Sequence, residues 1–169
     1  MAKWGSADYK ELKALAERLQ KLENDPRVRQ FCEACSKELA ARLLALVIPR
    51  TPVGRYPSET GKKGGTLRRG WTAGKNAGAS AYANEMHVEK KGNTYTIEVI
   101  NPVEYASYVE FGHRQTPGRY VPAIGKQLKA GWVNGQYFLT ISEAQLERIA
   151  PHILEQKLNK FFREIFDGT

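Results

Sequence analysis

The chain has 169 residues, of which 41% are hydrophobic and 26% charged, as in one globular domain rather than a disordered chain. No apolar run approaches the ~20 residues that span a bilayer, and residues 1–6 lack the apolar core of a secretory signal. Two cysteines cannot form a disulfide scaffold. We therefore expect a single-domain cytosolic protein over 1–169, without a membrane segment and with reduced thiols.

The net charge of +8 is confined to two segments. Residues 50–79 hold seven lysines and arginines against one acid, and residues 112–131 hold four against none. The same segments contain 11 of the 15 glycines and four of the eight prolines. Because this composition is typical of loops, we expect a nearly neutral scaffold with two long, projecting Gly/Pro-rich basic loops, over 50–66 and 112–131.

The N-terminal part is predicted to be helical. Apolar residues recur every three or four positions within residues 1–23, which predicts a first helix. Asp25 can cap a second helix that has Pro26 in its first turn. Its apolar stripe continues to Val47, so that a helix of about 22 residues and ~33 Å precedes a stop at Pro49.

A hairpin is predicted in the middle of the chain. Residues 50–84 show no periodicity, apart from 67–72, which could be a short strand or an irregular edge. Residues 86–90 and 94–100 alternate apolar and polar side chains on either side of residues 91–93. This pattern predicts an antiparallel hairpin with one buried face. The residues expected on that face are Tyr95, Ile97 and Val99.

The C-terminal part combines further helices with one ambiguous stretch. An Asn-Pro pair at 101–102 predicts a third helix that ends at Gly112, whereas residues 132–139 could be a strand or the start of a helix. A capping-box spacing from Ser142 opens a final amphipathic helix, which Pro151 should kink. The order of elements predicts an α+β fold, in which a small antiparallel β-sheet packs against long α-helices.

The sequence shows no pattern for catalysis, a cofactor or a metal ion. Cys32 and Cys35 have the spacing of half a zinc or redox site, but no second pair exists, and both fall on an apolar helix face, which favours core thiols. His113 follows Glu110, yet no nucleophile is positioned beside them. The glycine-rich residues 61–66 lack the spacing of a phosphate-binding loop. We therefore predict that the protein is not an enzyme.

The two basic loops are the stronger functional signal. Irregular connections of about 17 and 20 residues are uncommon in compact domains and usually serve a function or a partner. Three interpretations are open: loops that protein neighbours order, loops that stay solvated, and sequence-independent contact with nucleic acid. Arginines beside aromatic residues suit both protein interfaces and nucleic-acid backbones. The candidate interface residues are Arg55, Tyr56, Lys62, Lys63, Arg68, Arg69, Trp71, His113, Arg114, Arg119, Tyr120 and Trp132.

Several stretches resemble one known family. They are residues 64–72, residues 95–113 with the pattern Asn-Pro-x-x-Tyr-Ala-x-x-x-Glu-x-Gly, and residues 131–143 before the final helix. Together they resemble the HK97 gp10-like family of tailed-phage and prophage proteins. The resemblance implies a structural virion component at the head–tail junction: a tail-completion, terminator or neck protein that forms a homo-oligomeric ring, commonly of six subunits.

The same resemblance implies a place in a virion or phage-tail-like particle that is assembled in the host cytoplasm. It implies contacts with the tail tube and neighbouring neck proteins, and neither catalysis nor a cofactor. The basic loops fit such a role, because a ring subunit needs a compact scaffold and arms that neighbours can order. They could also touch DNA in the channel without sequence specificity. The rival prediction is a basic nucleic-acid-binding protein.

Overall fold

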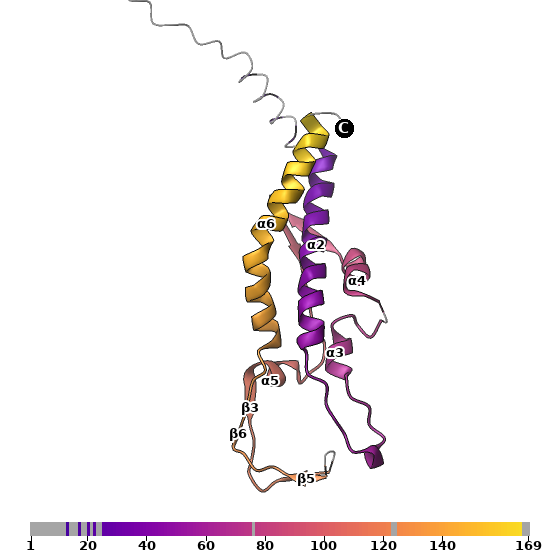
Figure 1. Ribbon diagram of the computed structural model, residues 1–169, viewed down its shortest axis with the longest axis vertical. Helices are drawn as coiled ribbons and strands as arrows, with labels where there is room; N and C mark the ends of the chain where they lie inside the picture. The colour runs from indigo at the N-terminus through magenta and orange to yellow at the C-terminus, as the bar shows by residue number, and fades with distance from the viewer. Residues whose placement is uncertain are drawn as a thin grey trace, which may run out of the picture.

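Two long helices form the spine of the molecule. Helix α2 spans Pro26–Arg50 and helix α6 spans Phe138–Phe166, and they lie side by side (Figure 1). Short helices and strands between them confirm the predicted α+β class. The computed structural model describes residues 25–75, 77–122 and 125–166, together with Lys13, Glu17, Gln20 and Leu22, which are helical. Most of the first helix predicted over residues 1–23 lies outside the described residues.

Helix α2 begins as predicted and ends later than expected. The carboxylate of Asp25 accepts a hydrogen bond from the backbone N–H of Arg27 at 2.8 Å and so caps the helix. Pro49 does not stop the helix, because it lies in the last turn, where its missing N–H removes a single hydrogen bond. The backbone N–H and the hydroxyl of Thr51 both donate to the carbonyl oxygen of Val47, which closes the helix.

The core lies where α2 meets two short helices and α6. Helix α3 spans Thr66–Gly70, where a strand or irregular edge was expected, and α4 spans Ala79–Glu85, where no regular element was expected. Segments of five and seven residues are too short for periodicity to distinguish a helix from a strand. These two segments are helical because the helical conformation buries Leu67 and Ala83 against α2. The buried core residues are Ala40, Leu44, Val47, Leu67, Trp71, Ala83 and Phe138.

The predicted hairpin is confirmed. Strands β1 (Val88–Lys91) and β2 (Thr94–Ile97) pair antiparallel around Gly92 and Asn93, and Gly92 has the positive φ, 59°, that a tight hairpin turn needs. Side chains 95, 97 and 99 are half-buried, and α2 lies against β2. Side chains 94, 96 and 98 are exposed on the outward face.

Helix α5 is shorter than predicted. It spans Ala106–Phe111 and ends before Gly112, as expected, but it does not begin at residues 101–102. The Asn101 side chain instead accepts a hydrogen bond from the Val103 N–H and donates to the carbonyl oxygen of Leu67 at 2.8 Å. These bonds hold the entry to α5 against α3, and the backbone is irregular there.

The second basic segment is paired rather than an irregular loop. Strand β3 (Gly112–Arg114) pairs with β6 (Trp132–Asn134), and β4 (Tyr120–Val121) pairs with β5 (Lys126–Gln127), both antiparallel. Backbone hydrogen bonds between residues 115–119 and 128–131 link the two pairs. We call this ribbon, over residues 112–134, the arm. The stretch at 132–139, for which a strand or a helix start was expected, contains both: β6 ends at Asn134, and α6 begins at Phe138.

The first basic segment has little regular structure. Between Arg50 and Thr66 it contains one short 3₁₀ turn, Ser58–Thr60, and we call residues 50–66 the loop. Loop and arm both project beyond the same end of the α2–α6 pair (Figure 1).

Helix α6 begins one turn before the predicted start at Ser142. The Ser142 hydroxyl donates to the carbonyl oxygen of Phe138 at 2.6 Å, inside the helix, so Ser142 is not the cap. Pro151 lies inside α6, and the helix changes direction near its middle (Figure 1). Of the helices described, none combines the length and the apolar character that crossing a membrane requires.

Candidate interaction surface

A buried carboxylate fastens the base of the arm to α6. Glu110 is only 4% exposed. Its carboxylate accepts hydrogen bonds from the backbone N–H of Leu139 at 3.0 Å, from that of Thr140 at 2.9 Å, and from the Thr140 hydroxyl at 2.7 Å. The first N–H groups of a helix lack intrahelical partners, and a negative charge at this end is favourable. Glu110 therefore supplies the cap that allows α6 to begin at Phe138.

Two glycines allow the backbones to approach closely at this junction. A Cβ atom on Gly135 would lie 2.2 Å from the carbonyl oxygen of Glu110, and one on Gly112 would lie 2.4 Å from that of Val133. Gly112 also has a φ of 86°, which L side chains rarely adopt. The base of the arm is thus held firmly against α5 and α6.

The tip of the arm meets the loop. Arg55, Tyr56 and Pro57 from the loop and Lys126 from β5 line one hollow, so two segments far apart in the sequence bring cations together. The arm contains no acid, and Glu59 is the single acid of the loop. The projecting end of the molecule is therefore strongly basic.

Most predicted interface residues lie on the surface. Arg68 and His113 are half-buried and Trp71 is buried, whereas the other nine are exposed, with Tyr120 at 56% and Trp132 at 52%. The exposed members are Arg55, Tyr56, Lys62, Lys63, Arg69, Arg114, Arg119, Tyr120 and Trp132.

The predicted residues on α3 and after it support the fold. The indole N–H of Trp71 donates to the Thr51 hydroxyl at 2.7 Å, and the ring packs edge-on against Phe138. The guanidinium of Arg68 donates to the carbonyl oxygen of Thr51 at 2.7 Å, at the C-terminal end of α2. Arg69 donates to Gly64 at 3.2 Å, within the same stretch of chain. Trp71 therefore serves the core rather than the surface.

His113 lies at the turn from α5 into β3. Its Nδ1 is 3.4 Å from the carbonyl oxygen of Tyr108, and its ring stands edge-on to the Tyr108 ring at 5.8 Å. Its Nε2 is 3.3 Å from the amide nitrogen of Gln115. These are positioning contacts within the base of the arm.

Sequence reasoning missed a group of exposed aromatic residues beside the arm. Tyr105, at the N-cap of α5, and Tyr108 and Phe111 on α5 are 44%, 58% and 59% exposed, and Tyr137 before α6 is 47% exposed. Large exposed aromatic residues that gather on one part of a surface mark interaction sites. The three-residue spacing on α5 shows that they share a face, but only the tertiary structure shows that nothing described covers it.

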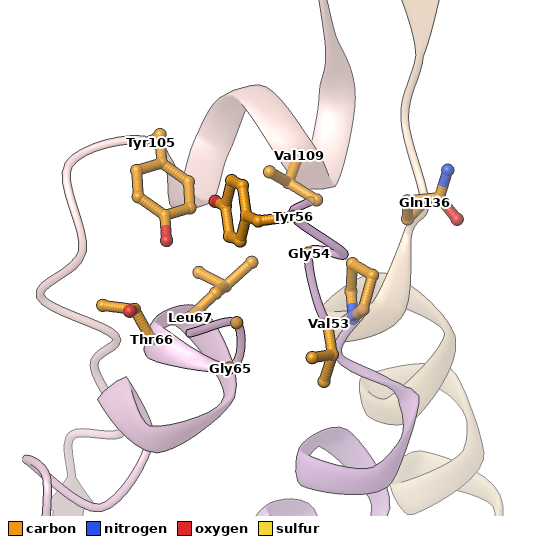
Figure 2. A pocket seen from close by; sticks show the side chains of 11 residues that line it. Val53, Gly54, Tyr56, Gly65, Thr66, Leu67, Tyr105, Val109 and Gln136 are labelled. Carbon is orange, nitrogen blue, oxygen red and sulfur yellow. The ribbon is translucent and has the colours of Figure 1, made fainter. Parts of the chain in front are cut away.

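A hollow of about 400 Å³ lies between the loop, α3 and α5. Figure 2 shows Tyr56 from the loop with Leu67 below it, Val109 of α5 above it and Tyr105, which precedes α5, to its left. None of the described residues that line it is charged. Apolar, glycine and tyrosine residues line it together with the uncharged polar residues Thr66 and Gln136, and such a lining suits the packing of a protein segment.

The two cysteines lie within α2, Cys35 buried and Cys32 half-buried. Burial raises the pKa of both thiols and so disfavours the reactive thiolate. Among the described residues, no three or more His, Cys, Asp or Glu residues gather in a way that could hold a metal ion.

A comparison with known protein families gives a match over much of the chain. The family model described as "Bacteriophage HK97-gp10, putative tail-component" matches residues 13–112, more than half of the sequence. The match includes α2 to α5 with Glu110, and it ends where the arm begins. No curated protein and no solved structure matches the chain.

Proposed function

Because the chain belongs to the HK97-gp10-like family of phage tail components, we propose that it is a ring-forming subunit at the head–tail junction. It acts there as a tail-completion, terminator or neck protein, and its role is structural rather than catalytic. Copies contact one another head-to-tail, and such heterologous contacts close into a ring when the rotation between copies divides a full turn. We expect six copies, in contact with the tail tube and neighbouring neck proteins.

The arm is the observation that carries this proposal. A two-stranded ribbon is only marginally stable in water, yet this one projects from the helices and exposes Tyr120 and Trp132 beside arginines. Aromatic and arginine side chains are enriched in protein interfaces and dominate their binding energy. Burial of the arm against a neighbouring protein would stabilise the ribbon and remove its aromatic rings from water.

Replacement of two arm residues tests the role of the arm. We expect Arg114→Ala combined with Arg119→Ala to impair the joining of particles without unfolding the subunit, since both side chains are exposed. Electron microscopy of complemented particles gives the joining efficiency, and thermal unfolding followed by circular dichroism gives the stability. The matched control is Arg148→Ala with Arg163→Ala, two exposed arginines on α6. Normal joining by the folded arm variant would contradict the proposed role.

Assembly itself tests the ring. Purified protein, alone and mixed with tail tubes, should form oligomers whose population rises with protein concentration, as seen by mass photometry and negative-stain microscopy. A chain that stays monomeric in both preparations would refute the proposed function.

A second candidate function is sequence-independent binding of nucleic acid, which the basic hollow at Arg55 and Lys126 favours. It requires duplex binding by the isolated subunit that falls steeply with salt, because cations that neutralise phosphates release counterions. The ring function requires little such binding. Contact with DNA in the channel of an assembled particle would show instead as disturbed DNA retention after charge reversal at Lys62 and Lys63.

A further inference from the structure

An acidic hollow lies where the hairpin meets the end of α4, on a part of the chain separate from the arm. It has a volume of about 680 Å³ and lies between the end of α4 and strands β1 and β2. Glu89, Thr96 and Glu98 line it as exposed residues, and Tyr82, Met86 and Ile97 line it as half-buried ones. His87 completes the lining. We call this site the acidic hollow; it offers two carboxylates beside an apolar area.

The carboxylates of the acidic hollow are available to an outside cation. Within the described residues, Glu98 has no ion-pair partner, and Glu89 pairs with Lys91 of its own strand at 3.1 Å. Both side chains of that pair are more than half exposed, and exposed pairs contribute about 0–1 kcal/mol. A lysine or arginine of a partner protein can therefore replace Lys91 in the ion pair with Glu89 when the partner covers this surface and excludes water from it.

The arm has the complementary properties. It carries Arg114, Arg119, Lys126 and Lys129, all exposed, and no acid. The loop beside its tip is also basic, since Arg55 and Lys126 line one hollow. The tip of the arm thus presents cations that another molecule can pair with carboxylates.

Strand register shows which side of the arm is open. Tyr120 pairs with Gln127, and Val121 pairs with Lys126, so Tyr120 lies on the face opposite to Lys126 and the loop. Tyr120 is more than half exposed there. The Leu128 N–H donates to the carbonyl oxygen of Arg119, so Arg119 lies, like Lys126, on the opposite face of the ribbon from Tyr120. The ribbon therefore offers a tyrosine ring on one face and cations on the other, and a hollow that takes up the edge of the ribbon can meet the ring with its apolar area and the cations with its carboxylates.

We propose that the arm of one copy docks in the acidic hollow of the next copy, a contact that rests on the proposed ring. Tyr120, on one face of the ribbon, covers the apolar area, and cations of the opposite face, Arg119 among them, reach round the edge of the ribbon to Glu89 and Glu98. Arm and hollow are different surfaces of the chain, so the contact is heterologous and repeats from copy to copy. Opposite charges across the contact speed association and select the register.

A charge swap tests the contact. We expect Arg119→Glu with Lys129→Glu, and separately Glu89→Lys with Glu98→Lys, to raise the protein concentration needed for assembly about tenfold or more. The two sets combined in one chain should restore assembly, because opposite charges face each other again. Glu147→Lys with Glu155→Lys, on exposed positions of α6, is the matched control and should assemble normally. Circular dichroism monitors the fold of each variant.

A crosslink provides a second measurement that does not depend on weakened assembly. Gln127→Cys, at the exposed register partner of Tyr120, combined with Thr96→Cys should give disulfide-linked ladders of subunits under oxidation, whereas Gln127→Cys alone should not. Rings that form normally in both charge-reversed variants, with no ladder, would overturn the docking contact and leave the ring intact. An arm variant that assembles normally but loses duplex DNA binding would assign the arm to nucleic acid and also overturn it. A wild-type chain that never assembles would refute the ring itself.

Discussion

Glu110 shows how one residue links the matched family segment to the rest of the chain. Its carboxylate is buried and accepts three hydrogen bonds from the first turn of α6, about thirty residues away in the sequence. In the sequence it stands out as a neighbour of His113 and as the glutamate of the Asn-Pro-x-x-Tyr-Ala-x-x-x-Glu-x-Gly pattern, and neither indicates a helix cap. The structure gives it a different role: it caps a helix and so positions the arm relative to the spine.

Removal of this cap should destabilise the fold. We expect Glu110→Ala to lower the free energy of unfolding by about 1–2 kcal/mol, because it leaves two partly buried N–H donors of the first turn of α6 without their acceptor. Glu110→Gln, which keeps one acceptor oxygen, should cost less. Urea denaturation gives both values, and Glu104→Gln, at an exposed position, is the control. A loss below about 0.5 kcal/mol for Glu110→Ala would contradict the capping role.

At the scale of elements, the junction of α5, the arm and α6 depends on close backbone contact. The chain leaves α5 at Gly112, passes through the arm and returns at Gly135, beside the carbonyl oxygen of Glu110. The N–H groups of Gln136 and Tyr137 then donate to the carbonyl oxygens of Val109 and Glu110. These backbone bonds make α5 and the start of α6 one unit from which the arm extends.

Two glycines near β6 form a matched test of this junction. Gly135→Ala should lower the free energy of unfolding by about 1–3 kcal/mol, since its methyl group would overlap backbone atoms. Gly131→Ala has nothing within 4 Å of the added carbon and should change stability by less than about 0.5 kcal/mol. Thermal or urea unfolding compares the two. Equal effects would show that close packing at Gly135 does not matter.

The whole molecule separates its positive charge from its core. The loop and the arm, which hold most of the excess of basic residues, project from one end, while the buried residues lie between α2, α3, α4 and α6. Stability therefore resides in the helical body, and the basic end contributes surface. A subunit whose arm is stabilised by contact with a neighbouring copy needs such a separation, because its body must fold before the arm has its partner.

Shortening of the arm tests this division. Replacement of residues 116–130 by Asn-Gly keeps the β3–β6 pair and joins Gln115 to Gly131 through a two-residue turn. We expect a melting temperature close to that of the full chain, because no core residue is removed, and loss of assembly. Differential scanning calorimetry and mass photometry measure the two properties. Rings formed by the shortened chain would show that the arm is dispensable.

Some elements could be predicted because short-range chemistry specifies them. The start of α2 follows from a capping aspartate, and the hairpin follows from alternation on either side of a glycine turn. The exposed candidates Arg119 and Tyr120 follow from the composition of a basic segment. Nothing in a short window distinguishes Trp71, which is buried, from Trp132, which is exposed.

The local order of the amino acids thus sets the long helices, the hairpin with its inner face, and the position of the positive charge. Tertiary contacts decide the rest: the helical state of α3 and α4, the early start of α6, the pairing of the arm, and the distinction between core and surface aromatics. The physical reason is that these features depend on partners far along the chain. Examples are the carboxylate of Glu110 for Thr140 and the hydroxyl of Thr51 for Trp71.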